Sequence, residues 1–133
     1  GDDLRIVHKL YPLRSHPNAD GAARAAVAAQ KQGRFREMEK ALFDHQGALQ
    51  ASELEGYALL AGLDLERFRK DLASELPAQV VARDRDEADA AGLDGTPFVV
   101  VNGRPFDTSL FRLQQDLAPW IALEIEIARA KKR

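Results

Sequence analysis

The chain has 133 residues, 45% hydrophobic and 30% charged, which is ordinary for one globular domain with a single core. Its 19 Lys and Arg against 21 Asp and Glu give a net charge of −2, which argues against nucleic acid or an anionic membrane as the main partner. No apolar run approaches the ~20 residues that cross a bilayer. The absence of cysteine excludes disulfides, thiolate metal sites and thiol nucleophiles within these residues.

The first predicted element is a strand over residues 4–11, which are rich in β-forming side chains and are closed by Pro12. Residues 19–32 are mostly alanine and predict a helix that packs closely on a neighbour. After Gly33 a second helix is predicted over residues 34–46, because Phe35, Met38, Leu42 and Phe43 recur at helical spacing.

Three more helices are predicted before Gly92. Ser52 and Glu55 match a capping box, which predicts a helix that starts there and ends at Gly62. Asp64 is a typical N-cap for a short fourth helix. Pro77 suits the first turn of a fifth helix over residues 78–91, whose charged middle indicates a solvated face.

Residues 95–104 are the most informative stretch of the chain. Pro97 cannot donate to a β-ladder, so it should lie at the first position of a strand that continues over residues 98–101. Asn102 and Gly103 are the strongest short signal for a type I′ hairpin turn, and Pro105 suggests that the returning strand is an edge. Residues 107–109 are then expected to cap a last helix that runs past Trp120, read as a core residue.

The predicted order is strand, several helices, hairpin and helix, which favours an α/β layer with an inserted helical subdomain. We divide the single domain into a core strand over residues 1–13, a helical insertion over 16–91, and a hairpin with its helix over 92–133. One strand and a hairpin make a three-stranded sheet, which is thin for this length. We therefore expect a missing N-terminal piece or one supplied by another chain.

Several segments resemble the DsbA-like branch of the thioredoxin superfamily, bacterial disulfide oxidoreductases with a helical insertion. Residues 6–13 resemble the family's strand with its F-P-L end, and residues 16–26 its first insertion helix. Residues 32–38 resemble its Q-G-K-F-W-E-M stretch, followed by an L-L-F-like Ala-Leu-Phe at 41–43. Residues 92–97 match the G-V-x-G-T-P entry to the cis-proline strand.

Two features depart from the family pattern. The family's Cys-x-x-Cys motif, with its strand and helix, would precede residue 1, so the catalytic residues are unknown here. Arg36 stands where the family often has tryptophan, and Glu39 where it often has histidine. The resemblance thus implies a thioredoxin-like fold whose N-terminal strand and active-site helix are missing.

The resemblance implies a protein thiol-disulfide oxidoreductase, present without its redox cysteines and therefore inactive alone. It implies a cis peptide before Pro97 and a substrate-binding loop of Gly95, Thr96 and Pro97, which would contact a protein or peptide with thiols or a disulfide. It also implies a periplasmic or other extracytoplasmic location, with the cytoplasm as the alternative. We expect self-association through an exposed sheet edge.

Two other readings stay open. One is a redox-inactive DsbA-like module for protein binding or structure. The other is a relative of the kappa-class glutathione transferases and isomerases, which typically carry valine rather than threonine before the cis-proline, so Thr96 counts against it. His8, His16 and His45 show no metal-ligand spacing, and we expect neither a metal nor a cofactor.

Overall fold

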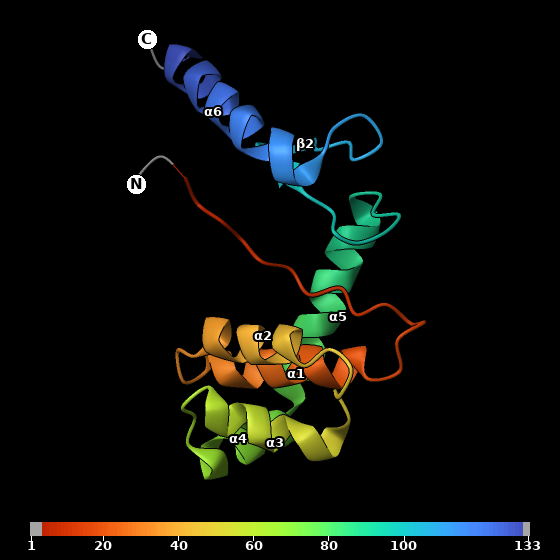
Figure 1. Cartoon of the computed structure of the whole chain (residues 1–133), viewed down its shortest axis with the longest axis vertical. Helices are drawn as coiled ribbons and strands as arrows, with labels where there is room; N and C mark the ends of the chain where they lie inside the picture. Colours follow the sequence, from red (N-terminus) through yellow and green to blue (C-terminus); the bar gives the residue numbers. More distant parts are fainter. Residues whose placement is uncertain (1–3, 132–133) are drawn as a thin grey trace. The chain divides into compact units, whose positions relative to one another are not determined.

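The computed structural model describes residues 4–131, and their contacts divide the chain into two compact units. The helical unit is His8–Gly92, and the hairpin unit combines Gly1–Val7 with Leu93–Arg133. Figure 1 shows the elements in chain order. Residues 16–91, predicted as a helical insertion, lie within the helical unit.

The helical unit contains α1 (Ala19–Gln30), α2 (Phe35–Asp44), α3 (Ala51–Leu60), α4 (Leu65–Ala73) and α5 (Glu75–Ala90). Helix α1 contacts each of the other four. Its alanines make this possible, because side chains of one carbon let neighbouring backbones approach closely while favouring the helix itself. Ala25, Ala28 and Ala29 are completely buried in these contacts.

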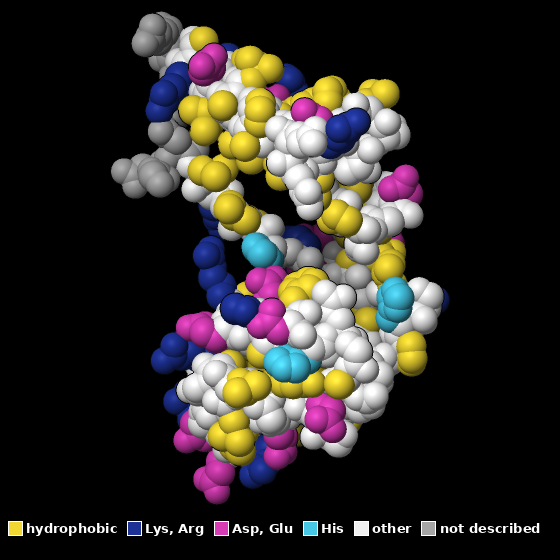
Figure 2. All heavy atoms as spheres, viewed as in Figure 1, with side chains coloured by type: hydrophobic (Ala, Val, Ile, Leu, Met, Phe, Trp, Pro, Cys, Tyr) yellow, Lys and Arg dark blue, Asp and Glu magenta, His cyan; other side chains and the backbone are white. Residues whose placement is uncertain are grey.

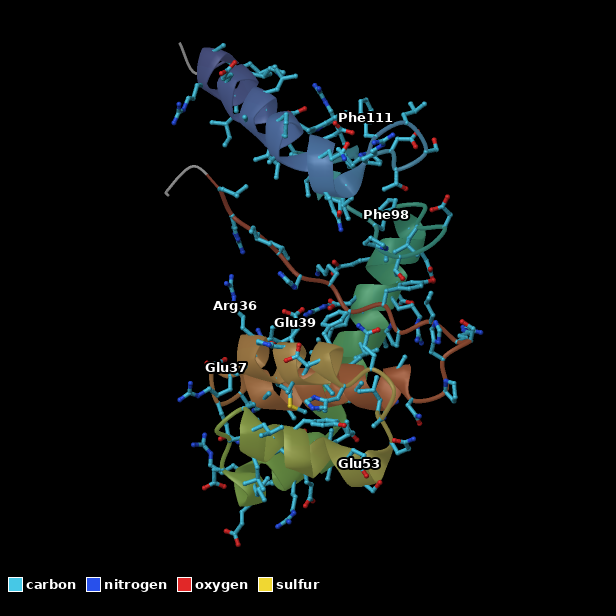
Figure 3. The ribbon with its side chains drawn as sticks, viewed as in Figure 1. Arg36, Glu37, Glu39, Glu53, Phe98 and Phe111 are labelled. Carbon is cyan, nitrogen blue, oxygen red and sulfur yellow. The ribbon has the colours of Figure 1, made fainter. Side chains whose placement is uncertain are left out.

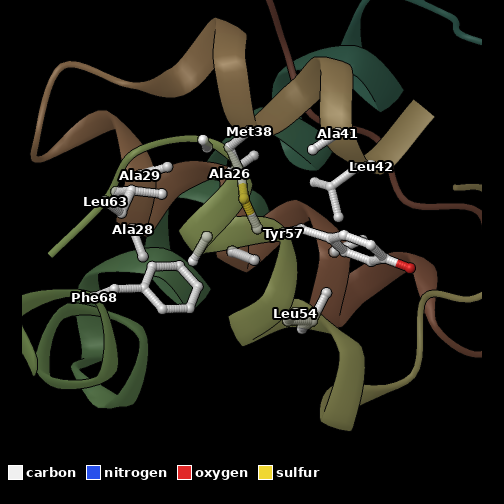
Figure 4. Close-up of a cluster of buried hydrophobic side chains, with 14 residues drawn as sticks. Ala26, Ala28, Ala29, Met38, Ala41, Leu42, Leu54, Tyr57, Leu63 and Phe68 are labelled. Atoms are coloured by element: carbon white, nitrogen blue, oxygen red, sulfur yellow. The ribbon is translucent and has the colours of Figure 1, made fainter. Parts of the chain in front are cut away.

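The core of this unit lies where α1 to α4 meet (Figure 4). Phe68 and Met38 are its largest fully buried side chains. Burying each contributes on the order of 1.5–3 kcal/mol relative to exposure. Leu54 and Tyr57 extend the cluster along α3, and the Tyr57 hydroxyl is satisfied by donating to the Ala48 carbonyl at 2.7 Å.

Of the two N-caps predicted for α3 and α4, the structure confirms the cap of α4 and contradicts that of α3. The Asp64 carboxylate accepts from the Arg67 backbone N–H at 2.9 Å, so the predicted N-cap of α4 is confirmed. The capping box at Ser52 is wrong. Helix α3 already begins at Ala51 with Gln50 as its N-cap, since Gln50 is extended and its carbonyl accepts from the Glu53 N–H at 2.9 Å. Ser52 therefore lies inside the first turn.

The hairpin unit contains β1 (Val100–Val101), β2 (Arg104–Pro105) and α6 (Leu113–Lys131). The strands are antiparallel, with Val101 opposite Arg104 and Val100 opposite Pro105. Asn102 and Gly103 have φ angles of +51° and +80°, which confirms the predicted type I′ turn.

Two sequence expectations fail in this unit and at the start of the chain. Residues 4–13 form no strand, and the described residues form a two-stranded rather than a three-stranded sheet. Leu4, Ile6 and Val7 are exposed instead. A β-prone sequence becomes a strand only against a partner, because its stability comes from ladder bonds and cross-strand contacts. Residues 1–3 of the predicted strand lie outside the described residues.

The start of α6 also differs from the prediction. The Asp107 carboxylate accepts from the Ser109 N–H at 2.9 Å, which closes a local turn four residues before the helix. Helix α6 begins at Leu113, and the Asp116 side chain accepts from the Arg112 N–H at 2.6 Å. An aspartate that bonds its own turn satisfies the backbone locally and does not cap the helix beyond it.

Candidate functional site

The predicted binding loop, Gly95 to Pro97, leads directly into the hairpin. The Thr96–Pro97 peptide bond is cis, as the sequence resemblance implied. Thr96 and Pro97 are exposed, whereas Gly95 is half-buried. The loop thus presents Thr96 and Pro97 at the surface. Its role in binding a polypeptide stays a prediction.

The hydrogen bonds of the hairpin decide which backbone groups remain available. The Phe106 N–H donates to the Val99 carbonyl at 2.8 Å, one step beyond the pair Val100 and Pro105. Peptide groups of an extended chain alternate in direction, so Val99 and Val101 face β2. The N–H and C=O of Val100 consequently point away from β2, to the outer edge of β1.

The two edges of the hairpin are unequal. Pro105 occupies the position on β2 whose peptide group points outward, and it has no N–H to offer there. The outer edge of β1 carries no proline after Pro97 and no charged residue over residues 98–101. Edges of sheets in monomeric proteins are usually blunted by such residues. Among the described residues, therefore, β2 is the blunted edge and β1 the open one.

Helix α6 holds the hairpin from one face. The Glu124 carboxylate is 6% exposed, accepts from Arg104 Nη1 at 3.0 Å, and lies 3.4 Å from Asn102 Nδ2. Phe106, Phe111 and Trp120 form a three-ring cluster with centroids 5.1–5.7 Å apart. Trp120, predicted to be a core residue, is only half-buried and packs in this three-ring cluster. Figure 3 labels Phe98 and Phe111 at this end of the chain.

Apolar side chains are exposed around this cluster. Figure 2 shows them gathered over α6 and the hairpin. Val100 is 46% exposed and Leu110 is 75% exposed, and Phe111 and Leu123 are also accessible. Exposed apolar surface next to an open strand edge is typical of a protein interaction site.

In the helical unit, a buried carboxylate fixes the segment that precedes α1. Asp84 of α5 is 3% exposed, accepts from the Leu10 N–H at 3.1 Å, and lies 3.3 Å from Lys9 Nζ. Lys9 also pairs with Glu87 at 2.6 Å, and this hydrogen bond raises the Lys9 pKa. The predicted solvated face of α5 is thus wrong at Asp84, because the segment at residues 8–12 covers it.

Two further contacts extend this clamp. The Tyr11 hydroxyl donates to Asp89 at 2.7 Å, which raises the pKa of the phenol. The guanidinium of Arg85 donates to the Pro12 carbonyl at 2.8 Å. The acidic and basic residues of α5 therefore act as anchors for an extended segment. The sequence analysis did not predict that α5 anchors residues 8–12, although a helix with alternating acidic and basic residues is compatible with such a role.

The histidines occupy separate places. His8 lies 3.1 Å from Glu39 and its ring meets Phe35 edge-on, while His45 stacks on Tyr57. Figure 3 labels Glu39 and Arg36 on α2, the positions where the sequence departs from the family pattern. Within residues 4–131, no three His, Asp or Glu side chains gather as metal ligands.

Comparison with known proteins identifies the class to which this fold belongs. A model of the DSBA-like thioredoxin domain matches residues 2–118, so the chain belongs to the DSBA-like thioredoxin domain family. No solved structure matches the chain at a significant level. None of the described helices is both long and apolar enough to cross a membrane.

Curated relatives are similar to the chain over a limited part of their own length. The Na(+)/H(+) antiporter NhaA 1 of Mycolicibacterium gilvum is 46% identical over 107 residues, which cover 78% of this chain and 17% of the antiporter. The NhaA 1 of Salinispora arenicola is 47% identical over 103 residues, covering 77% and 16%. The NhaA of Herminiimonas arsenicoxydans is 44% identical over 104 residues, covering 78% and 16%. The chain thus spans about a sixth of these relatives.

Proposed function

We propose that this chain is a redox-inactive DsbA-like module that binds protein or supports a larger polypeptide. The observation that carries the proposal is the family match over residues 2–118 in a sequence without cysteine. Disulfide exchange needs a thiolate that attacks one sulfur of a disulfide while the other leaves as a thiolate. These 133 residues supply no thiol for either role.

The surface best suited to binding runs from Gly95 to Val101. It combines the exposed Thr96 and Pro97 with the open edge of β1 and the exposed side chain of Val100. An extended polypeptide could add there as a strand, since its main chain would satisfy the outward N–H and C=O of Val100. The bound segment needs no cysteine in this mode.

The relatives suggest where such a module works. Because the similar segments are parts of proteins named as Na(+)/H(+) antiporters, we propose that the chain is an accessory domain of a longer antiporter-related polypeptide. It would bind a segment of that polypeptide or of a protein near it. Ion exchange itself would belong to the rest of the polypeptide.

The second candidate function is a thiol-disulfide oxidoreductase. It is favoured by the Thr96–Pro97 dipeptide, which lies within the region that matches the family. It requires a Cys-x-x-Cys supplied by residues outside these 133. A thiolate with lowered pKa at a helix N-terminus would then perform the exchange, and the loop of Gly95, Thr96 and Pro97 would orient the partner chain. The location would be periplasmic or otherwise extracytoplasmic.

Two measurements separate these candidates. The first is insulin reduction in the presence of dithiothreitol: the 133-residue chain should not exceed the buffer rate, and the parent polypeptide should not either. Activity of the parent that is lost when upstream cysteines are replaced by serine would establish the oxidoreductase instead.

The second measurement is binding of a labelled, cysteine-free peptide of alternating valine and threonine, followed by fluorescence anisotropy. We expect saturable binding that Val100→Pro weakens, because the proline removes an outward N–H from β1. Leu110→Ser is the matched control, as it removes an exposed apolar side chain outside the strand. Equal affinity of both variants would refute β1 as the binding edge.

A further inference from the structure

We propose that Asn102, in the hairpin turn, is a site of spontaneous deamidation, and that the acid formed there weakens the attachment of the hairpin to α6. Three features of the turn support this chemistry: the residue that follows Asn102, the hydrogen bonds of the turn, and the buried carboxyl group beside the amide. The modification is independent of the binding role proposed above, because the reaction needs only water.

The reaction is an attack of a backbone nitrogen on a side-chain amide. The nitrogen of Gly103 bonds to Cγ of Asn102, and the Cγ–Nδ2 bond breaks. The side-chain nitrogen leaves as ammonia, having taken up the proton of the Gly103 N–H. Water then opens the resulting cyclic imide at either of its carbonyls, which leaves an aspartate or an isoaspartate. Asparagine is among the chemically labile side chains of proteins, and its conversion requires neither an oxidant nor a reductant.

The residue after Asn102 leaves the amide open to this attack. Gly103 has no Cβ, so no side chain blocks the approach of its nitrogen to Cγ. Asn102 and Gly103 are both exposed, so water reaches the turn. Because Val101 pairs with Arg104, the ladder does not use the Gly103 N–H, which donates to none of the described residues. The nitrogen is therefore free to react.

The small size of the hairpin also favours the reaction. Its strands have two residues each, Val100–Val101 and Arg104–Pro105. A hairpin of this size is marginally stable by itself, and such segments open locally at a small cost in free energy. Opening lets Asn102 leave the conformation of the type I′ turn and adopt the one that ring closure needs.

Asn18, the other asparagine of the chain, provides a natural comparison. It is also exposed, but Ala19 follows it, and the Cβ of alanine hinders the approach of the backbone nitrogen. The Ala19 N–H is occupied as well, because it donates to the His16 carbonyl at 3.0 Å. We therefore expect Asn18 to stay intact under conditions in which Asn102 reacts.

Deamidation removes a hydrogen-bond donor from beside a buried side chain. Asn102 Nδ2 lies 3.4 Å from Oε2 of Glu124, which is 6% exposed. An ionised aspartate has acceptors only, so the product sets one acceptor against another where the amide donated. Arg104, which donates to Glu124 at 3.0 Å, is then the remaining donor for both side chains. Isoaspartate also adds a carbon atom to the main chain of a two-residue turn. Both products therefore loosen the hairpin from α6.

Peptide mapping by mass spectrometry tests the reaction. The folded chain is incubated at mildly alkaline pH for several days and digested at acidic pH, and the aspartate and isoaspartate peptides are separated. The deamidated fraction should rise severalfold faster at Asn102 than at Asn18. Asn102→Gly, which suits the same turn, should give no deamidated hairpin peptide. Equal rates at the two asparagines, or an Asn102 that stays intact, would overturn the proposed site.

Urea unfolding followed by the fluorescence of Trp120 tests the consequence, since Trp120 lies in the hairpin unit. Asn102→Asp makes one product directly and should unfold at lower urea than Asn102→Gly, which only removes the amide. Both residues suit a type I′ turn before glycine, so the comparison isolates the new acid. Adding Glu124→Gln to Asn102→Asp should recover most of the difference, because the glutamine amide donates to the new carboxylate.

Circular dichroism must first show that these variants are folded. If Asn102→Asp is not, the deamidated natural chain, separated from the intact chain by ion exchange, takes its place. A urea midpoint for the acid form that is no lower than that of Asn102→Gly would refute the weakening. A midpoint that falls but is not restored by Glu124→Gln would show that the acid acts elsewhere than at Glu124, and would overturn the proposed contact.

Discussion

Arg104 on the hairpin reaches Glu124 on α6 at 3.0 Å, and this contact joins an exposed cation to a carboxylate that is 6% exposed. The carboxylate faces the hairpin turn, where Asn102 is its second neighbour. A buried carboxylate is tolerated only when its charge has partners. The pair therefore fixes the hairpin to the helix and, with it, the direction of the open edge of β1.

The first prediction removes Arg104. Arg104→Ala should destabilise the hairpin unit by about 1–3 kcal/mol, because the buried Glu124 side chain loses its main hydrogen-bond partner. Urea unfolding followed by tryptophan fluorescence measures this, since the single tryptophan, Trp120, lies in the same unit. Arg112→Ala is the control, as Arg112 is exposed and its side chain bonds only Gln115 among the contacts described. Identical midpoints for the two variants would contradict the argument.

The second prediction concerns Asp84. Asp84→Ala should cost about 1–3 kcal/mol, because the Leu10 N–H is left without its acceptor. Amide hydrogen exchange at Leu10 should become faster, and unfolding followed by far-ultraviolet circular dichroism should shift to lower urea. Asp86→Ala, an exposed position on the same helix, should leave both unchanged. Unaltered exchange at Leu10 would show that Asp84 does not hold the segment.

The third prediction uses the alkaline titration of Tyr11. Its hydrogen bond to Asp89 raises the phenol pKa above 10.0, so the folded chain holds this proton at a pH where the unfolded chain has released it. This contribution to stability is complete below the unfolded pKa and disappears as pH rises through the folded value. Lys9, whose pKa is also raised by its hydrogen bond to Glu87, loses its contribution in the same direction, above the ordinary lysine pKa of 10.5.

Ultraviolet absorbance at alkaline pH checks the Tyr11 prediction. The chain has two tyrosines, and Asp89→Ala should move one phenolate transition to lower pH while the other stays in place. Asp86→Ala is again the matched control. Superimposable titration curves for the natural chain and Asp89→Ala would contradict the proposed hydrogen bond.

The fourth prediction addresses the core of the helical unit. Phe68 is fully buried among α1, α3 and α4, so Phe68→Ala should lower the free energy of unfolding by about 3–5 kcal/mol. Phe43→Ala makes the same chemical change at a side chain that is 65% exposed, and its effect should stay within about 0.5 kcal/mol. Thermal unfolding followed by circular dichroism at the helix band compares the two; similar losses would place Phe68 outside the core.

Three local signals in the sequence predicted local structure correctly, whereas the caps expected at Ser52 and at residues 107–109 did not form. The alanine-rich stretch became α1, Asp64 capped α4, and Asn102 with Gly103 formed the type I′ turn. These features depend on the conformational preferences of one or a few adjacent residues, which are the same wherever the segment lies. The family resemblance, carried by segments along the chain, likewise led to the DSBA-like domain.

Tertiary structure decided what depends on a partner. Residues 4–11 have strand propensity, but they form no strand in the described chain, because a ladder needs a second strand in register. The environment of Asp84 also depends on a partner segment. The sequence predicted an exposed charge on the helix, but Asp84 is buried because the segment that contains Leu10 packs over it. The open edge of β1 is also a tertiary result. The residues 98–101 predict a strand by themselves, but only the pairing with Pro105 determines which of its peptide groups remain free to bind.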